Sequence, residues 1–129
     1  MPIEQQVGSG VSWEEEFAYS RAVRTGNRIL VSGTTATGPD GPVHLGDAGA
    51  QARYALGKVQ AAIEALGGAL DDVVRTRIFV KPGHDWEAVA RVHGEVFAAV
   101  KPACTLVFAH LIGEEYLVEI EAEAVVGDP

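Results

Sequence analysis

Two groups of side chains in this sequence are of types that perform chemistry. Glutamates stand at alternate positions late in the chain, at Glu119, Glu121 and Glu123, and Cys104 is the single cysteine. A carboxylate in a semi-enclosed cleft can act as a general base, although alternating glutamates are equally typical of a solvent-facing strand. A cysteine is a nucleophile when neighbours lower its thiol pKa, and otherwise packs as a small hydrophobe. Both alternatives stay open for both groups.

The arginines offer another kind of chemistry, which is the binding of a carboxylate. Arg75 and Arg77 lie two residues apart in a stretch typical of a strand, so they would share one face and could hold an anion there. Arg21 could serve the same purpose. Alternating arginines on a strand more often face solvent or an oligomer interface. All three are therefore candidate anchors, although a structural role is the more usual one for arginines in such positions.

Metal and nucleotide chemistry find no support in the sequence. The histidines do not approach a metal-binding spacing; they are His44, His84, His93 and His110. The sequence also contains no P-loop, no dinucleotide glycine fingerprint and no nucleophile elbow. We predict neither a metal site nor a cofactor.

The apolar pattern predicts the helices that must position these side chains. Asp47 is a plausible N-cap of a first helix that Gly67-Gly68 ends, and Asp85 caps a second helix that Pro102 stops. Apolar residues recur three or four positions apart in both, which places one stripe along each helix. The stripes consist of Ala52, Leu56, Val59, Ile63 and Leu66 in the first helix, and of Trp86, Val89, Val92 and Val96 in the second.

Strands are predicted on either side of the helices. Two short apolar runs around Thr25-Gly26-Asn27 predict a β-hairpin, and residues 73–80 alternate in the manner of a strand. Residues 103–111 form a nearly continuous apolar run, which predicts a central strand covered on both faces. Residues 117–126 alternate glutamates with apolar residues and predict the last strand.

This order of elements predicts one α+β domain over residues 1–129, with both helices on one face of a mixed sheet. The other sheet face would be solvated or covered by another copy of the chain. The apolar content of the strands favours an oligomer.

The composition argues against two classes of partner, nucleic acids and membranes. Ten basic residues against eighteen acidic ones give a net charge of -8, and the basic residues are scattered, so nucleic acid is an unfavourable partner. No apolar run approaches the roughly 20 residues that span a bilayer. The single cysteine and the absence of an export-like start predict a cytoplasmic protein.

Four segments resemble the RidA (YjgF) family of imine deaminases. Residues 19–23 and 26–33 resemble its tyrosine-serine-glutamine-alanine-valine segment and the serine-glycine that closes the next strand. Residues 72–80 are similar to its central strand, and residues 118–122 match its closing strand almost letter for letter. Their order and spacing cover nearly the whole chain.

The resemblance implies a chorismate-mutase-like fold, with two helices on one face of a mixed six-stranded sheet. It implies a homotrimer with small-molecule clefts between subunits, and no cofactor. Glu119 matches the glutamate that holds or activates the attacking water. The matching residues for substrate binding are Tyr19, Ser32, Gly33 and Cys104.

Cys104 marks a departure from the family pattern. The family's proline-alanine-arginine motif corresponds to Pro102-Ala103-Cys104, so a thiol stands where an arginine anchors the substrate carboxylate. A thiol lacks the bidentate fork of a guanidinium. We expect a deaminase of a small imine, enamine or conjugated amino acid, with Glu119 and Cys104 as catalytic candidates. A non-catalytic trimer that binds a metabolite and a 2-aminomuconate-deaminase-like enzyme are the alternatives.

Overall fold

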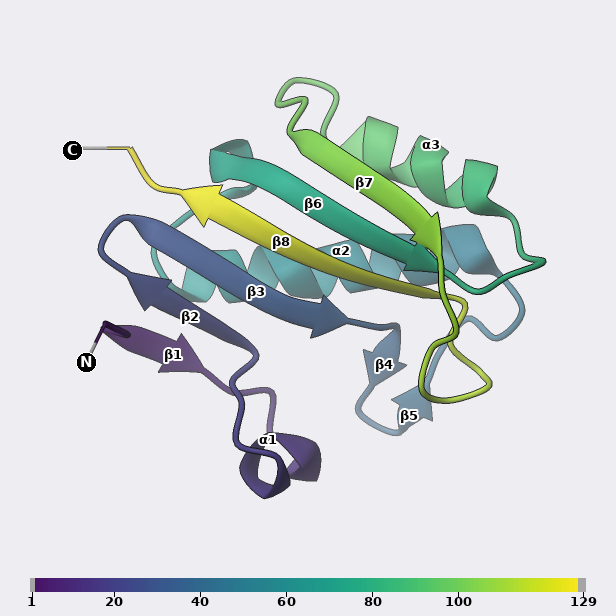
Figure 1. The fold of residues 1–129 in the computed structure, drawn as a ribbon, viewed down its shortest axis with the longest axis horizontal. Helices are drawn as coiled ribbons and strands as arrows, with labels where there is room; N and C mark the ends of the chain where they lie inside the picture. The colour runs from purple at the N-terminus through teal and green to yellow at the C-terminus, as the bar shows by residue number, and fades with distance from the viewer. Residues whose placement is uncertain (1, 128–129) are drawn as a thin grey trace.

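The strands of the main sheet come from both ends of the chain (Figure 1). The computed structural model describes residues 2–127. The sheet has the order β1-β2-β3-β8-β6-β7, in which β6 and β7 are parallel and the other neighbours antiparallel. Its strands are β1 (Gln5–Val7), β2 (Ala22–Thr25), β3 (Arg28–Thr34), β6 (Val73–Val80), β7 (Ala103–Phe108) and β8 (Val118–Val125). The prediction of a mixed α+β sheet is confirmed.

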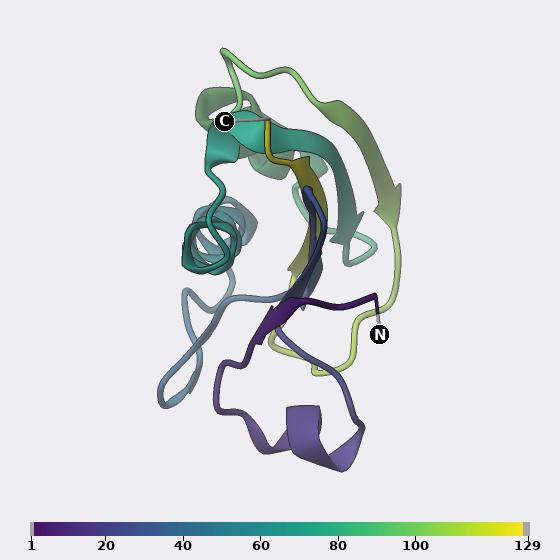
Figure 2. The ribbon, with the colours of Figure 1, turned by 90° about the vertical axis from the view of Figure 1, so that its left-hand side faces the viewer.

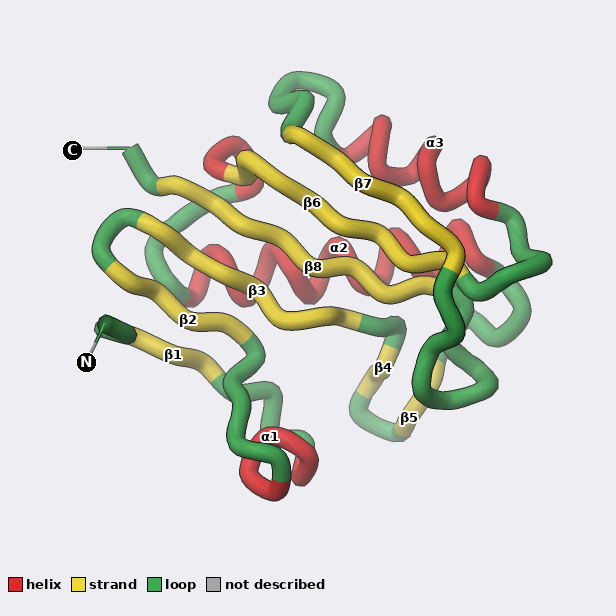
Figure 3. Tube along the Cα trace, viewed as in Figure 1, coloured by secondary structure: helices red, strands yellow, loops and turns green. Residues whose placement is uncertain are grey.

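The remaining elements connect these strands. A small two-stranded sheet follows β3, and a loop between β7 and β8 lies at the same end of the molecule (Figure 3). The small sheet consists of β4 (Thr37–Gly38) and β5 (Gly41–Pro42); the helices are α1 (Ser12–Glu16), α2 (Ala48–Ala65), the 3-10 turn η1 (Leu70–Asp72) and α3 (Trp86–Val96). The N-terminal segment contains β1 and α1.

Helices α2 and α3 cover one face of the main sheet, and the core lies between the two layers (Figure 2). The predicted stripe of α2 is buried throughout, and in α3 Val89 and Val92 are buried. The prediction that Trp86 belongs to the apolar stripe of the second helix is wrong, because Trp86 stands at the first position of α3 and is 45% exposed. Both predicted caps are confirmed, since the Asp47 and Asp85 carboxylates each accept a backbone N–H bond at 3.0 Å.

The predicted hairpin is confirmed as β2 and β3. Thr25 pairs with Arg28 across a two-residue turn of Gly26 and Asn27. Gly26 has a φ of 59°, a left-handed conformation that glycine adopts without strain. The turn therefore fixes the register of β3, which carries Ser32 and Gly33 at its far end.

The prediction that residues 103–111 form a central strand is wrong. β7 is the edge strand, pairing only with β6 among the described residues. Val107 and Phe108 are 44% and 54% exposed. An apolar run indicates that a strand needs cover, but it does not indicate whether its own chain provides it.

The alternation predicted for β6 fails at its start. The register shifts between Val73 and Arg75, so Val73 is buried and Val74 is 46% exposed. From Thr76 onward the predicted alternation holds, with Ile78 and Val80 in the core. A bulge of this kind changes which face a side chain occupies, and period-two patterns do not reveal it.

Candidate active site

A register shift near the end of β3 creates the candidate site. The pairing of β3 with β8 shifts between Val31 and Thr34, which leaves Ser32 and Gly33 out of the regular ladder. The Ser32 hydroxyl donates to the Ser20 carbonyl at 2.7 Å, and the Thr34 hydroxyl donates to the Ser32 carbonyl at 2.7 Å. Local hydrogen bonds therefore hold the strand in this irregular shape.

Glu119 lies directly against Gly33. Glu119 alternates with buried Val118 and Ile120 on β8, so its side chain points to the face that the helices leave open. A Cβ built on Gly33 would stand 2.5 Å from Glu119 Oε2. Glycine at position 33 thus makes room for this carboxyl group. The backbone conformation at this position does not itself call for glycine.

The guanidinium of Arg21 also contacts Gly33, through its backbone carbonyl. Arg21 Nη2 donates to the Ser32 carbonyl at 2.8 Å and to the Gly33 carbonyl at 2.5 Å. Burial raises the pKa of Glu119, while the Arg21 charge acts in the opposite direction. The site therefore holds a half-buried carboxyl group of increased basicity beside a half-buried cation.

A second cation reaches this region from α2. Lys58 Nζ donates to the carbonyls of Thr35 and Thr37, at 3.2 and 3.1 Å. Burial lowers the pKa of Lys58, and the nearby charge of Arg21 lowers it further. Lys58 was not predicted as a site residue, because its only local signal is its place beside the apolar stripe of α2, three positions after buried Ala55.

Tyr19 stands at the solvent side of the same region. Its backbone N–H donates to the Glu14 carbonyl at 3.0 Å, which ties it to α1, and its side chain is 41% exposed. Tyr19 also contributes to the electrostatic environment of Arg21. The structure thus brings four predicted site residues together around one bulge: Tyr19, Ser32, Gly33 and Glu119.

Cys104 lies elsewhere in the chain. Its register partner is Thr76 of β6, and paired residues of parallel strands point to the same face. Thr76 is fully buried on the helix side, where its Oγ1 lies 2.8 Å from His93 Nε2. Exposed Cys104 is therefore on the helix side at the sheet edge, with β6 between it and the strand of Glu119. Burial lowers the pKa of His93.

Comparison with known proteins decides the family. Residues 12–126 match the family model described as Endoribonuclease L-PSP. An uncharacterized protein of Streptomyces coelicolor is 39% identical over 121 residues, 93% of this chain and 90% of that protein. A RutC family protein of Pyrococcus horikoshii is 33% identical over 107 residues, 82% of this chain and 85% of that protein.

A solved structure agrees with the sequence comparisons. The crystal structure of Rv2704 from Mycobacterium tuberculosis, a member of the YjgF/YER057c/UK114 family, is 41% identical with a TM-score of 0.85. The match covers 95% of this chain and 98% of that one. The chain belongs to the RidA (YjgF) family. The resemblance predicted from four sequence segments is thereby confirmed, as is the family's sheet with its two main helices.

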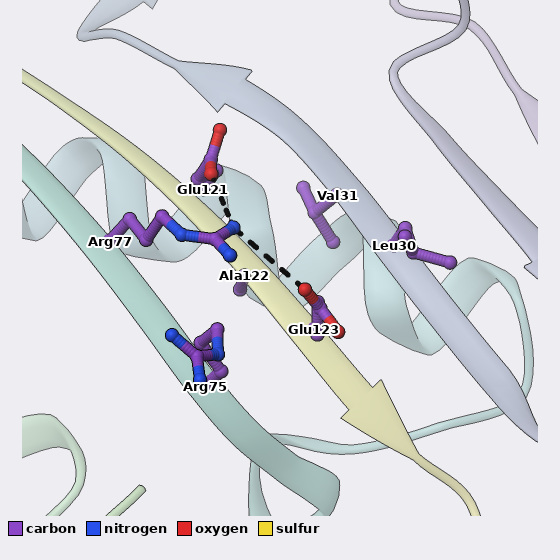
Figure 4. A pocket seen from close by; sticks show the side chains of 7 residues that line it. All are labelled: Leu30, Val31, Arg75, Arg77, Glu121, Ala122 and Glu123. Atoms are coloured by element: carbon purple, nitrogen blue, oxygen red, sulfur yellow. Dashed lines mark hydrogen bonds and ion pairs between the residues drawn. The ribbon is translucent and has the colours of Figure 1, made fainter. Parts of the chain in front are cut away.

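The open sheet face of this RidA-family protein also carries a charged pocket of about 120 Å³ (Figure 4). Arg77 lies between two carboxylates there, 2.7 Å from Glu121 and 3.8 Å from Glu123. Arg75 lines the same pocket. Since Arg77 is already paired, it is a poor candidate for a substrate anchor. Within residues 2–127, no cluster of three histidine, cysteine or acidic side chains is placed to hold a metal.

Proposed function

We propose that this RidA-family protein is a hydrolytic deaminase of small imines or enamines. An enamine first tautomerises to its imine. Water then adds to the carbon of the C=N bond, the nitrogen takes up a proton, and the carbon–nitrogen bond breaks, so that ammonia leaves and a carbonyl product remains. Glu119 takes the proton from the attacking water. The observation that supports this role best is the half-buried Glu119 carboxyl group packed against Gly33, on the open face of the sheet.

The environment of Glu119 suits a general base. A base works best when its pKa lies near the working pH, because it must be deprotonated and still basic enough to accept a proton. Burial raises the pKa of Glu119 in this direction, whereas the Arg21 charge limits the rise. Glu119 therefore gains basicity from burial, as a general base requires.

The proposed clefts lie between subunits of a homotrimer. Edge strand β7 exposes Val107 and Phe108, and a neighbouring copy on this edge would cover them. Cys104 lies on that edge, far along the sheet from Tyr19 and Gly33. A neighbouring copy would supply the contact between these two groups that one chain does not make. Cys104 is then a wall of the cleft.

Cys104 favours a second candidate function, a non-catalytic trimer that binds a small metabolite. A thiol is a weak single donor, so it does not replace the carboxylate-binding fork of an arginine.

The nuclease activity in the family model's description gains no support here, because the net charge is -8 and the cations are scattered.

Ammonia release from freshly generated 2-aminoacrylate and 2-iminopropionate tests the proposal. We expect wild type to accelerate the release and Glu119→Ala to lose the acceleration. Activity that is found only in Cys104→Arg would show an intact scaffold whose natural ligand differs. Bound ligand without turnover in all three proteins would favour the metabolite-binding alternative.

Gly33→Ala is expected to lower ammonia release by about 10²-fold, the effect of misplacing a catalytic group by about an ångström. The new methyl group would stand 2.5 Å from Glu119 Oε2, so the carboxyl group must move. Gly57→Ala is the matched control, because nothing lies within 4 Å of a Cβ there. This helix substitution should keep activity and stabilise the protein by about 0.5–1 kcal/mol in thermal unfolding. Equal activity in both variants would contradict the assigned role of Gly33.

A further inference from the structure

Arg21 is held in place by the backbone of the site. Both of its short hydrogen bonds use Nη2, which donates to the carbonyls of Ser32 and Gly33 at 2.8 and 2.5 Å. A guanidinium has five N–H donors, so those on Nε and Nη1 remain. Nε is buried and has no hydrogen-bond partner among residues 2–127. An unsatisfied donor of this kind is costly unless a ligand or water pairs with it.

The positive charge of Arg21 is not neutralised by an ion pair. Within the described residues, the ion pairs involve other arginines, and no carboxylate pairs with Arg21. Glu14 contributes to its electrostatic environment, but the Glu14 carboxylate accepts hydrogen bonds from the backbone and hydroxyl of Ser9. Glu119 also favours the charged form of Arg21, but it forms no ion pair with it among the described residues. A half-buried guanidinium is thus left with capacity for an anion.

Lys58 adds a second positive charge near Arg21. It approaches from α2 and is fixed on the carbonyls of Thr35 and Thr37, just beyond the end of β3. Burial lowers the pKa of Lys58, the charge of Arg21 lowers it further, and Glu14 acts in the opposite direction. A substrate carboxylate near both cations would add to the attraction that Glu14 already provides.

We propose that Arg21, assisted by the charge of Lys58, binds the carboxylate of the substrate and replaces the anchoring arginine that the family pattern places at Cys104. This assignment restricts the proposed imine or enamine substrates to those that carry a carboxylate. This inference rests on the proposed function for its substrate, but its test does not depend on turnover.

Pyruvate, the carbonyl product of 2-iminopropionate, is the probe, and its amide is the uncharged comparison. We expect wild type to bind pyruvate more tightly than the amide in calorimetric or NMR titrations. Arg21→Gln should weaken pyruvate binding and raise KM for 2-iminopropionate roughly ten- to a hundredfold, as expected for charge-assisted hydrogen bonds. The kcat value should stay near that of wild type, and binding of the amide should not change.

Arg24→Gln is the matched control, because Arg24 also braces the backbone, on the Gly26 and Leu66 carbonyls. It should leave pyruvate binding unchanged. If Arg21→Gln does not fold, the Nε–H resonance of Arg21 in wild type gives the same information, since pyruvate should shift it and the amide should not.

The outcomes separate this inference from the proposed function. Pyruvate binding through Arg21 without ammonia release would support the anchor and contradict the deaminase. Ammonia release with a KM that Arg21→Gln leaves unchanged would overturn the anchor and support the deaminase. Failure of wild type to prefer pyruvate over its amide would also overturn the anchor.

Discussion

Replacing Glu119 by glutamine is expected to lower kcat for ammonia release by roughly 10²- to 10⁴-fold, which is the range that a positioned general base contributes. Glutamine keeps the size of the side chain beside Gly33, but its amide does not accept the proton of the attacking water. KM should change little, because Glu119 is assigned to water and not to the substrate carboxylate. Steady-state ammonia release measures both parameters.

Glu123→Gln is the control for this substitution. Glu123 lies on the same face of β8 and pairs with Arg28 at 3.0 Å and with Arg77 at 3.8 Å, away from Gly33. Its loss removes partly exposed ion pairs, which contribute about 0–1 kcal/mol each. Wild-type activity should remain. A similar loss of activity in both variants would indicate a general effect of charge on this sheet face and not a catalytic role of Glu119.

Glu119→Gln should raise folding stability at neutral pH although it lowers activity. Because burial raises the pKa of Glu119, the folded state binds this proton more tightly than the unfolded state does. The stability from this proton is present at low pH and is lost as pH rises through the folded-state pKa. Glu119→Gln should therefore have a higher free energy of unfolding than wild type at neutral pH. Denaturant titrations should show the difference shrinking below the ordinary glutamate pKa.

Ile120→Ala is expected to lower the free energy of unfolding by about 2–5 kcal/mol, the usual cost of truncating a large core side chain. Ile120 is fully buried on β8, with Thr34 of β3 and Ile78 of β6 as its register partners. Since domains of this kind are stable by only about 5–15 kcal/mol, a large part of the stability would be lost. Urea unfolding at fixed protein concentration measures the change.

Ile112→Ala is the matched control, because Ile112 is 80% exposed in the loop between β7 and β8. The same chemical change should alter the free energy of unfolding by no more than about 0.5 kcal/mol. A large loss in this control would mean that Ile112 is covered by another copy of the chain, and would change the account of the open surfaces.

The parts of the fold that sequence predicts here are those set by local patterns. The stripe of α2, the two aspartate caps and the Gly26-Asn27 turn each depend on residues within a few positions of one another. Periodicity is informative because every such residue contacts the same layer. β7 could not be placed in this way, since its position at the edge depends on its pairing with β6 and with no other strand among residues 2–127.

The family resemblance supplied Gly33 and the role expected of Glu119, whereas Arg21 was predicted only as one of three candidate anchors. Gly33 and Glu119 are far apart in sequence, and their contact depends on the bulge near the end of β3. Arg21 and Lys58 acquire their places through long-range hydrogen bonds to backbone carbonyls, which any arginine or lysine could make. Residue type therefore carries no signal of these contacts, and only the folded chain reveals them.

The pH dependence of kcat/KM for ammonia release from 2-iminopropionate tests whether Glu119 is the general base. We expect a rate that rises with pH through a pKa above the ordinary glutamate value, because Glu119 must be deprotonated and burial raises its pKa. In Glu119→Gln this rise should disappear, and only a low rate should remain. Either a wild-type rate equal to the uncatalysed rate at every pH or an unchanged rise in Glu119→Gln would contradict the account.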